Sequence, residues 1–293
     1  MEKYRIFSPK RNKDKPRKNG KKWLTIDRIT TFPYYLVLIG LIAIPFLIMI
    51  LYAFNDASAG VFEIQFSLHH FRKFFEERAF IQTMLESLYL AGISTVITLI
   101  IAYPLAYLIS VSKIRVRVIM ILIVTAPMWI NMLLRANALK QIFETFAPNL
   151  LGTNFVLIFG IVYMFLPFMV LPIYTVLLKI DKSLYESAAD LGANRFKIIT
   201  KVIIPLSLSG VISGCMMVFL PAATTFVIPK YLGDGKRKMI GDLIESAILM
   251  PSDYGYGYGA AIAIVLGLIM MVFIYFAKKV DKYQGVSTNE NNE

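Results

Sequence analysis

The chain has a single cysteine and, for its length, few charged residues. Because Cys215 is alone among 293 residues, the chain cannot form an intrachain disulfide or a cysteine-based metal cluster. Charged residues make up 17% and hydrophobic residues 57%, whereas soluble domains average about 25% and about 45–50%. A soluble monomer of this composition would have too little polar surface to cover itself. The composition therefore predicts an integral membrane protein.

The sequence motifs of several enzyme classes are also missing. The chain contains no G-x-x-x-x-G-K-[ST], G-x-S-x-G, H-E-x-x-H or C-x-x-C, so we expect it to bind no nucleotide phosphates itself. The adjacent His69 and His70 have no third ligand at metal spacing, and ordinary interfacial histidines are the better interpretation. We therefore predict no catalytic residues, no metal site and no cofactor bound by this chain.

Six apolar segments have about 20 residues each, the length that a helix needs to cross the hydrocarbon of a bilayer. We predict an all-α, polytopic membrane protein whose six transmembrane helices span residues 33–54, 87–110, 117–139, 155–178, 200–228 and 260–277. None of the six segments contains Asp or Glu. Carriers coupled to protons or sodium usually place ionisable groups within the membrane, so this absence argues against an ion-coupled carrier.

The net charge of +12 is unevenly distributed, because eleven of the 31 basic residues precede Thr31. Basic residues accumulate in cytoplasmic loops, which predicts that both termini and the connection 179–201 face the cytoplasm. This gives a basic tail at 1–31, a six-span domain at 32–277 and a second cytoplasmic tail at 278–293. The N-terminal charge is better explained by orientation or lipid headgroups than by nucleic acid, which we do not expect as a partner.

Two segments on the opposite side, 55–86 and 230–259, are long enough to have structure of their own. Residues 66–75 are amphipathic and are predicted to lie near the membrane interface. Residues 254–259 alternate Tyr and Gly, which predicts a loop rich in turns.

The connection between the fourth and fifth predicted spans has the signals of a short helix. Ser183 and Glu186 have the spacing of a capping box, so we expect the helix to begin at Leu184. Gly192 is placed to end it in the left-handed conformation. One face of this helix is apolar, formed by Leu184, Ala188 and Leu191. A helix this short is marginal alone in water, so we expect a partner to bind it.

Residues 186–205 resemble the motif E-A-A-x(3)-G-x(9)-I-x-L-P of ABC-importer permeases. The chain departs from it at Ser187 for Ala, Val202 for Ile and Ile204 for Leu, all small changes of volume. The resemblance implies that residues 183–193 form the coupling helix, which docks in a cleft of a cytoplasmic ATPase; the alternative is a plain connecting helix. The residues implied in coupling are Glu186, Ala188, Ala189, Asp190, Leu191, Gly192 and Pro205.

Two further stretches are similar to the polyamine-type permeases of this family. Residues 126–138 resemble P-x-W-x(5)-R-x-x-A, and residues 224–244 resemble T-x-F-V-T-P-x-L-L-G followed by M-I-G-N-L-I. The residues that this likeness suggests for a translocation path are Trp129, Asn131, Arg135, Thr224, Thr225, Asp242 and Glu245. The residues themselves leave alternatives open. The tryptophan and arginine can anchor at the interface, the threonines can bond helix backbones, and the two acids can bind a second permease.

The resemblance implies a permease subunit of an ATP-driven importer in the bacterial inner (plasma) membrane, with polyamines such as spermidine and putrescine as substrates. The long basic N-terminal tail fits the B-type permease of that branch. The implied partners are a homologous second permease, two cytoplasmic ATPase subunits that use the ATP, and an extracytoplasmic substrate-binding protein, so this chain itself would not be an enzyme. The alternatives are an importer of another solute (an aminophosphonate, an opine or an iron complex) and a stand-alone channel or ion-coupled carrier.

Overall fold

The computed structural model describes residues 31–55, 65–249 and 255–290, and these residues are almost entirely helical. Within them the extended pairing is limited to one isolated bridge between Asn55 and Phe66. This confirms the prediction of an all-α protein. By contacts, the chain divides into a first unit, Met1–Met49, and a second unit, Ile50–Glu293, which contains both candidate sites.

Four helices are long and apolar enough to cross a membrane, or up to six if each of two bent helix pairs counts as one span. The four are Thr31–Phe54, which contains a π-turn (Ile39–Ala43) and α2 (Ile44–Phe54), then α4 (Arg78–Val111), α7 (Asn154–Leu177) and the segment Gly255–Lys279 of α14 (Gly255–Glu290). Helix α14 continues without a break into the predicted C-terminal tail.

The predicted spans 117–139 and 200–228 are single apolar runs in the sequence, but neither is one straight helix. The first divides into α5 (Ile114–Thr125) with a 3₁₀ turn (Ala126–Trp129), and α6 (Met132–Phe146), bent by 94°. The chain turns at Ile130, which is extended, and Asn131 then begins α6 by accepting a hydrogen bond from the Leu133 amide at 2.8 Å. A side-chain cap of this kind is a common start of a new helix.

The second of these runs contains α9 (Arg195–Ile198), a π-turn (Ile199–Ile203), α10 (Ile204–Leu206) and α11 (Leu208–Thr224). The part before Ser207 and the part after it are bent by 66°. Pro205 lies two residues before Ser207, and it cannot donate a backbone hydrogen bond.

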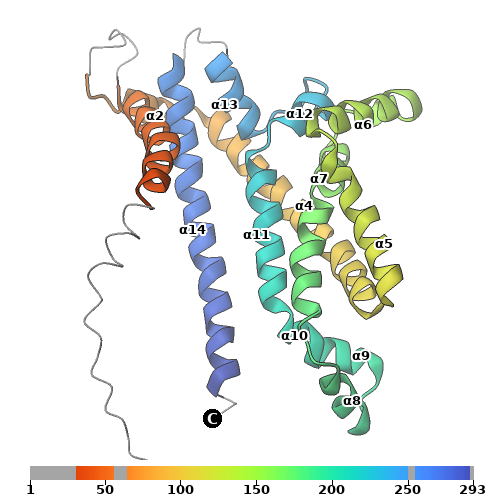
Figure 1. Ribbon diagram of the computed structural model, residues 1–293. Coiled ribbons are helices and arrows are strands. Elements are labelled where there is room, and N and C mark those ends of the chain that lie inside the picture. Colours follow the sequence, from red (N-terminus) through yellow and green to blue (C-terminus); the bar gives the residue numbers. More distant parts are fainter. Residues whose placement is uncertain (1–30, 56–64, 250–254, 291–293) are drawn as a thin grey trace, which may run out of the picture. The chain divides into compact units, whose positions relative to one another are not determined.

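Helices α4, α7 and α11 pack together and form the centre of the second unit (Figure 1). Small residues permit this close packing. A side chain at Gly210 of α11 would meet the Pro172 carbonyl of α7 at 3.0 Å, and one at Gly214 would meet the Met169 sulfur at 2.7 Å. Close contact on this scale makes α11 and α7 a tightly fitted pair.

The shorter described helices lie at the two ends of this centre. They are α3 (His69–Glu76), a 3₁₀ turn (Pro148–Leu150), α8 (Lys182–Asp190), α12 (Val227–Leu232) and α13 (Ile240–Leu249). Helices α12 and α13 lie at one end of α11, and α8 and α9 lie at the other (Figure 1).

The Tyr–Gly run predicted as a turn-rich loop is instead the beginning of α14, apart from Tyr254, which lies outside the described residues. Helix α3 packs against this part of α14. A side chain at Gly257 would overlap the His70 ring and would approach the Tyr52 carbonyl to 2.6 Å. The glycine therefore serves close packing rather than a turn. His70 itself is buried, and its Nε2 lies 3.0 Å from the Asn55 carbonyl.

Candidate functional site

The connecting helix α8 begins two residues earlier than predicted. Asp181, and not Ser183, is its N-cap, and its carboxylate accepts a hydrogen bond from the Ser183 amide at 3.0 Å. This hydrogen bond lowers the pKa of the Asp181 carboxyl. The predicted capping box is therefore wrong, because Asp181 caps the helix first and places Ser183 inside it.

The C-terminal end of α8 is formed as predicted. Gly192 has φ +78°, and its amide donates to the Ala189 carbonyl at 2.9 Å, while the Ala193 amide donates to the Ala188 carbonyl at 3.1 Å. These two bonds are the 5→2 and 6→1 pair of a Schellman motif. The glycine ends α8 abruptly and turns the chain toward α9.

Helix α8 has an inner and an outer face. Tyr185 and Ala188 are partly buried and pack against the core of the chain. Leu184 is 43% exposed and Leu191 is 89% exposed, so Ala188 does not share their face in the way that the sequence predicts. Helical spacing alone cannot show which side of a short helix meets the rest of the chain. The remaining predicted coupling residues of the helix, Glu186, Ala189 and Asp190, are exposed.

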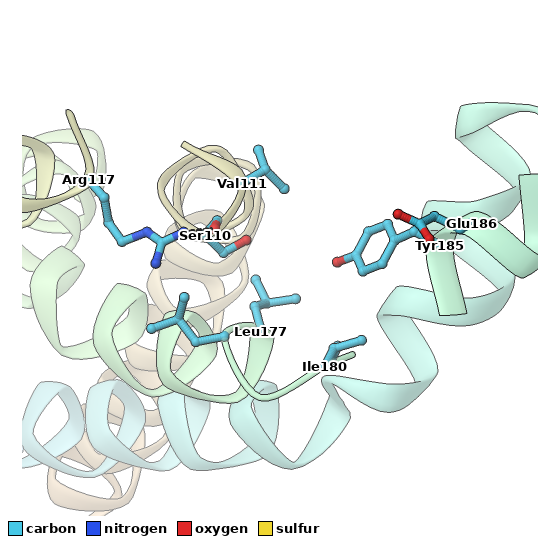
Figure 2. Close-up of a pocket in the computed structure, with 8 residues that line it drawn as sticks. Ser110, Val111, Arg117, Leu177, Ile180, Tyr185 and Glu186 are labelled. Atoms are coloured by element: carbon cyan, nitrogen blue, oxygen red, sulfur yellow. Dashed lines mark hydrogen bonds between the residues drawn. The ribbon is translucent and has the colours of Figure 1, made fainter. Parts of the chain in front are cut away.

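The inner face of α8 borders a cleft of about 390 Å³, called the Tyr185 cleft here (Figure 2). The Tyr185 ring points across it toward the ends of α4 and α7 (Figure 2), and burial raises the pKa of its hydroxyl. On the far side, Arg117 donates to the carbonyls of Ser110 and Ser112, at 2.6 and 3.1 Å, and so satisfies the end of α4. The cleft is lined by Ser110, Val111, Arg117, Leu177, Leu178, Ile180, Tyr185 and Glu186.

At the other end of α11, a second cleft of about 330 Å³ brings together two of the predicted path residues, Thr224 and Glu245. We call it the Glu245 cleft. Glu245 is paired with Lys230 at 2.7 Å, which raises the pKa of the lysine. The Lys230 ammonium also lies 5.9 Å from the centre of the Phe226 ring. The lining residues are Thr224, Phe226, Gly241, Ile244, Glu245, Ile248 and Leu249.

Asp242 is partly buried beside this cleft, and its burial raises the pKa of its carboxyl. The Thr224 hydroxyl donates to the Leu220 carbonyl at 3.1 Å, so it bonds its own helix backbone, as the alternative interpretation allows. Thr225 is buried and forms the C-terminal end of α11.

The three predicted path residues near the α5–α6 bend do not line this cleft. Trp129 is 87% exposed, and Asn131 is engaged as the N-cap of α6. Arg135 is only 8% exposed, so it does not extend to the surface of this chain. Its Nε and Nη1 atoms have no hydrogen-bond partner among the described residues.

Sequence reasoning missed the residues that hold the Glu245 cleft together. The Ile240 amide, at the start of α13, donates to the Ser87 hydroxyl of α4 at 2.8 Å. A side chain at Gly241 would lie 2.7 Å from the Thr225 carbonyl and closer still to that of Thr224. The only signal in the sequence was the Met-Ile-Gly motif, whose contacts cannot be deduced from spacing. No group of His, Cys, Asp and Glu side chains suited to a metal occurs in the part of the chain that the structure describes.

The comparisons with known proteins cover most of the chain. Residues 94–283 match the family model described as "binding-protein-dependent transport system inner membrane component". The spermidine/putrescine transport system permease protein PotB of Haemophilus influenzae is 32% identical over 267 residues, which cover 85% of this chain and 93% of the relative. PotB of Escherichia coli is 31% identical over 241 residues, covering 76% and 87%.

Solved structures of ABC transporters have the same fold. A chain of a bacterial alginate ABC transporter, crystallised with an alginate-bound periplasmic protein, superimposes with a TM-score of 0.68 at 17% identity, covering 88% of this chain and 93% of the other. A chain of the MetNI methionine ABC transporter, in an inward-facing conformation, gives a TM-score of 0.54 at 16% identity, covering 70% and 95%.

Proposed function

Because the chain belongs to the family of binding-protein-dependent transport system inner membrane components, we propose that it is the permease subunit of an ATP-driven importer of polyamines. It is a multi-pass protein of the inner membrane. The observation that supports the coupling role most strongly is helix α8, which is capped at both ends and held on one face, and which leaves its other face uncovered.

The outer face of α8 is suited to docking on an ATPase subunit. Leu191 exposes 89% of its surface at the tip of the helix, and burial of a leucine is worth about 1.5–3 kcal/mol. Ala189 adds no bulk and Asp190 provides charge at the rim, while Glu186, although exposed, borders the Tyr185 cleft. A nine-residue helix with such a face is explained by a partner, whereas a plain connection needs no exposed leucine.

The proposed partners are two cytoplasmic ATPase subunits, a homologous second permease and an extracytoplasmic substrate-binding protein. ATP bound to the ATPases would favour the conformation in which they close on each other, and α8 would move with them. The transporter would then alternate between inward-open and outward-open states because ATP binds the two states with different affinity. Lys179–Lys201 and both termini are placed on the cytoplasmic side in this proposal.

Polyamines are the proposed substrates because the relatives with 31–32% identity are spermidine/putrescine permeases by name. The Glu245 cleft has a carboxylate and an aromatic ring, both of which attract alkylammonium groups. Both lie near the Lys230 ammonium, which a polyamine ammonium would replace. The Glu245 cleft and the bend at Ser207 lie at opposite ends of α11, which has 17 residues and is therefore about 25 Å long. The proposed path residues are Trp129, Asn131, Arg135, Thr224, Thr225, Asp242 and Glu245, with Asp242 and Glu245 attracting cations toward the cleft.

Co-expression of the chain with its ATPase, second permease and binding protein tests this proposal. An ATPase subunit should co-purify with the chain in detergent, and vesicles that contain the whole complex should import spermidine only when ATP is supplied. A panel of competitors then separates substrates: excess putrescine should inhibit uptake, and an aminophosphonate or an iron chelate should not. Inhibition by an anionic solute alone would overturn the polyamine assignment. Solute flux through the chain without an ATPase would overturn the importer.

A further inference from the structure

A hydrogen bond joins α4 to the bend between α10 and α11. The Tyr103 hydroxyl of α4 lies 2.8 Å from the Ser207 hydroxyl at the bend. Ser207 is completely buried. The two residues are 104 positions apart in the sequence. This bond therefore connects α4 directly to the bend at Ser207.

Ser207 forms hydrogen bonds on two sides. Its hydroxyl lies 2.8 Å from the Tyr103 hydroxyl, where either oxygen can be the donor, and 3.2 Å from the Ile204 carbonyl, which can only accept. The Ser207 amide is shared between the Ile203 and Ile204 carbonyls, at 2.9 and 3.2 Å. The hydroxyl and the amide of Ser207 thus provide hydrogen-bond donors to the Ile203 and Ile204 carbonyls, next to Pro205.

The bend is also the place where movement of α8 must enter the centre of the fold. The chain leaves α8 at Gly192, passes through α9, the π-turn and α10, and reaches α11 at Leu208. Beyond the bend, α11 is held tightly against α7 at Gly210 and Gly214. π-turns such as this one occur frequently at functional sites. A loose bend would absorb the displacement of α8 instead of passing it to α11.

We propose that Tyr103 is a positioning residue: its hydroxyl stiffens the bend at Ser207, so that displacement of α8 is transmitted to α11. The direction of this movement rests on the proposed function. The stiffness of the bend does not depend on the proposed function, because it can be measured in the chain by itself. A hydrogen bond buried in a low dielectric is strengthened, and its loss leaves a polar atom unsatisfied.

The stiffness can be measured by the distance between two spin labels on either side of the bend. In a Cys215→Ser background, which removes the only native thiol, cysteines at the exposed positions 201 and 217 carry the labels in lipid nanodiscs. Tyr103→Phe and Ser207→Ala should each broaden the distance distribution, and the double variant should be no broader than either. Ser207→Thr keeps the hydroxyl and should keep the narrow distribution.

Tyr107→Phe is the matched control, because it removes a hydroxyl from the next turn of α4 that forms no hydrogen bond with Ser207, whereas Tyr103 does. It should leave the distribution unchanged. An equal width in Tyr103→Phe and wild type, or equal broadening by Tyr107→Phe, would overturn the proposal.

The complete importer provides the functional readout. Tyr103→Phe should raise the ATP hydrolysed per spermidine imported about two- to tenfold, the loss expected for one hydrogen bond, with complex yield unchanged. A merely structural role would lower ATP hydrolysis and uptake in proportion, and that result would also overturn the proposal. If the wild-type complex ignores spermidine, the substrate assignment fails, and the label distances alone decide the role of Tyr103.

Discussion

Substitution of Gly192 tests whether the shape of α8, and not only its composition, matters for coupling. The backbone of Gly192 has φ +78°, and a side chain added there would meet no atom within 4 Å. Any effect of Gly192→Ala therefore comes from the backbone and not from a clash within the chain.

The magnitude follows from two opposing terms. The left-handed conformation costs an L-residue about 1–2 kcal/mol, and replacing glycine returns about 0.4–1 kcal/mol by restricting the unfolded chain. The net cost is about 0–1.6 kcal/mol, with a central value of about 0.8 kcal/mol. Because a nine-residue helix is marginal, this cost lowers the fraction of chains with a formed α8. At the central value, the affinity for the ATPase falls about fourfold.

The assay is binding of purified ATPase subunits to the permease in nanodiscs. The expected order of affinity is Gly, then Asn, which tolerates the left-handed region, then Ala, then Val, whose branched side chain resists it. Ala equal to Gly, or Asn no better than Val, would refute the reasoning, because the backbone conformation would then have no part in docking.

Three further predictions concern other parts of the structure. Leu191→Glu should leave the thermal stability of the permease unchanged, because the side chain is 89% exposed, and should weaken ATPase binding about 10- to 100-fold by the loss of a buried leucine; a normal affinity would remove Leu191 from the interface. Gly241→Ala should lower stability by about 1–3 kcal/mol because its side chain meets backbone, whereas Gly267→Ala, with no atom within 4 Å, should not; equal melting temperatures would show that α13 is not fixed there. Burial raises the pKa of the Asp242 carboxyl, so its contribution to stability is present at low pH and is lost as the pH rises through this raised pKa. Asp242→Asn should therefore raise the melting temperature at neutral pH and not in acid. A difference in melting temperature that is the same at both pH values would contradict burial as the cause of the pKa shift.

Much of the fold was predictable because long apolar runs in the sequence indicate membrane helices. The bends at Ile130 and Ser207 were not, since the apolar runs continue through both of them. At Ile130 the cause is local, an extended residue followed by an Asn cap. At Ser207 a local proline is joined by a long-range hydrogen bond to Tyr103, which lies 104 positions earlier in the sequence. The Tyr–Gly run was misread because the glycines have different causes: Gly257 packs on His70, Gly259 packs against Ala247 and Ile248, and only Gly255 has a positive φ, at +61°.

Of the candidate site, the position and the C-terminal end of α8 were predictable, whereas its N-cap and its inner face were not. The motif located α8, and Gly192 marked its end, because a glycine in the left-handed region is a strong local signal. The choice between Asp181 and Ser183 as the cap depends on backbone geometry. The inner face of α8 depends on how Tyr185 and Ala188 pack against the core of the chain. The predicted path residues fall into two separate groups, because spacing in the sequence does not show which helices lie side by side. Thr224 and Glu245 line one cleft, whereas Trp129, Asn131 and Arg135 lie near the bend between α5 and α6.

The central claim is that this permease moves a polyamine only when an ATPase acts on α8. The most direct test is uptake of radiolabelled spermidine by vesicles that contain the complete complex with the binding protein, with ATP supplied on the ATPase side. The account predicts uptake that requires ATP, stops when the binding protein is omitted, and falls in step with ATPase affinity across the Gly192 variants. Spermidine uptake that proceeds at the same rate without ATP, or that is unchanged in Gly192→Val, would contradict it.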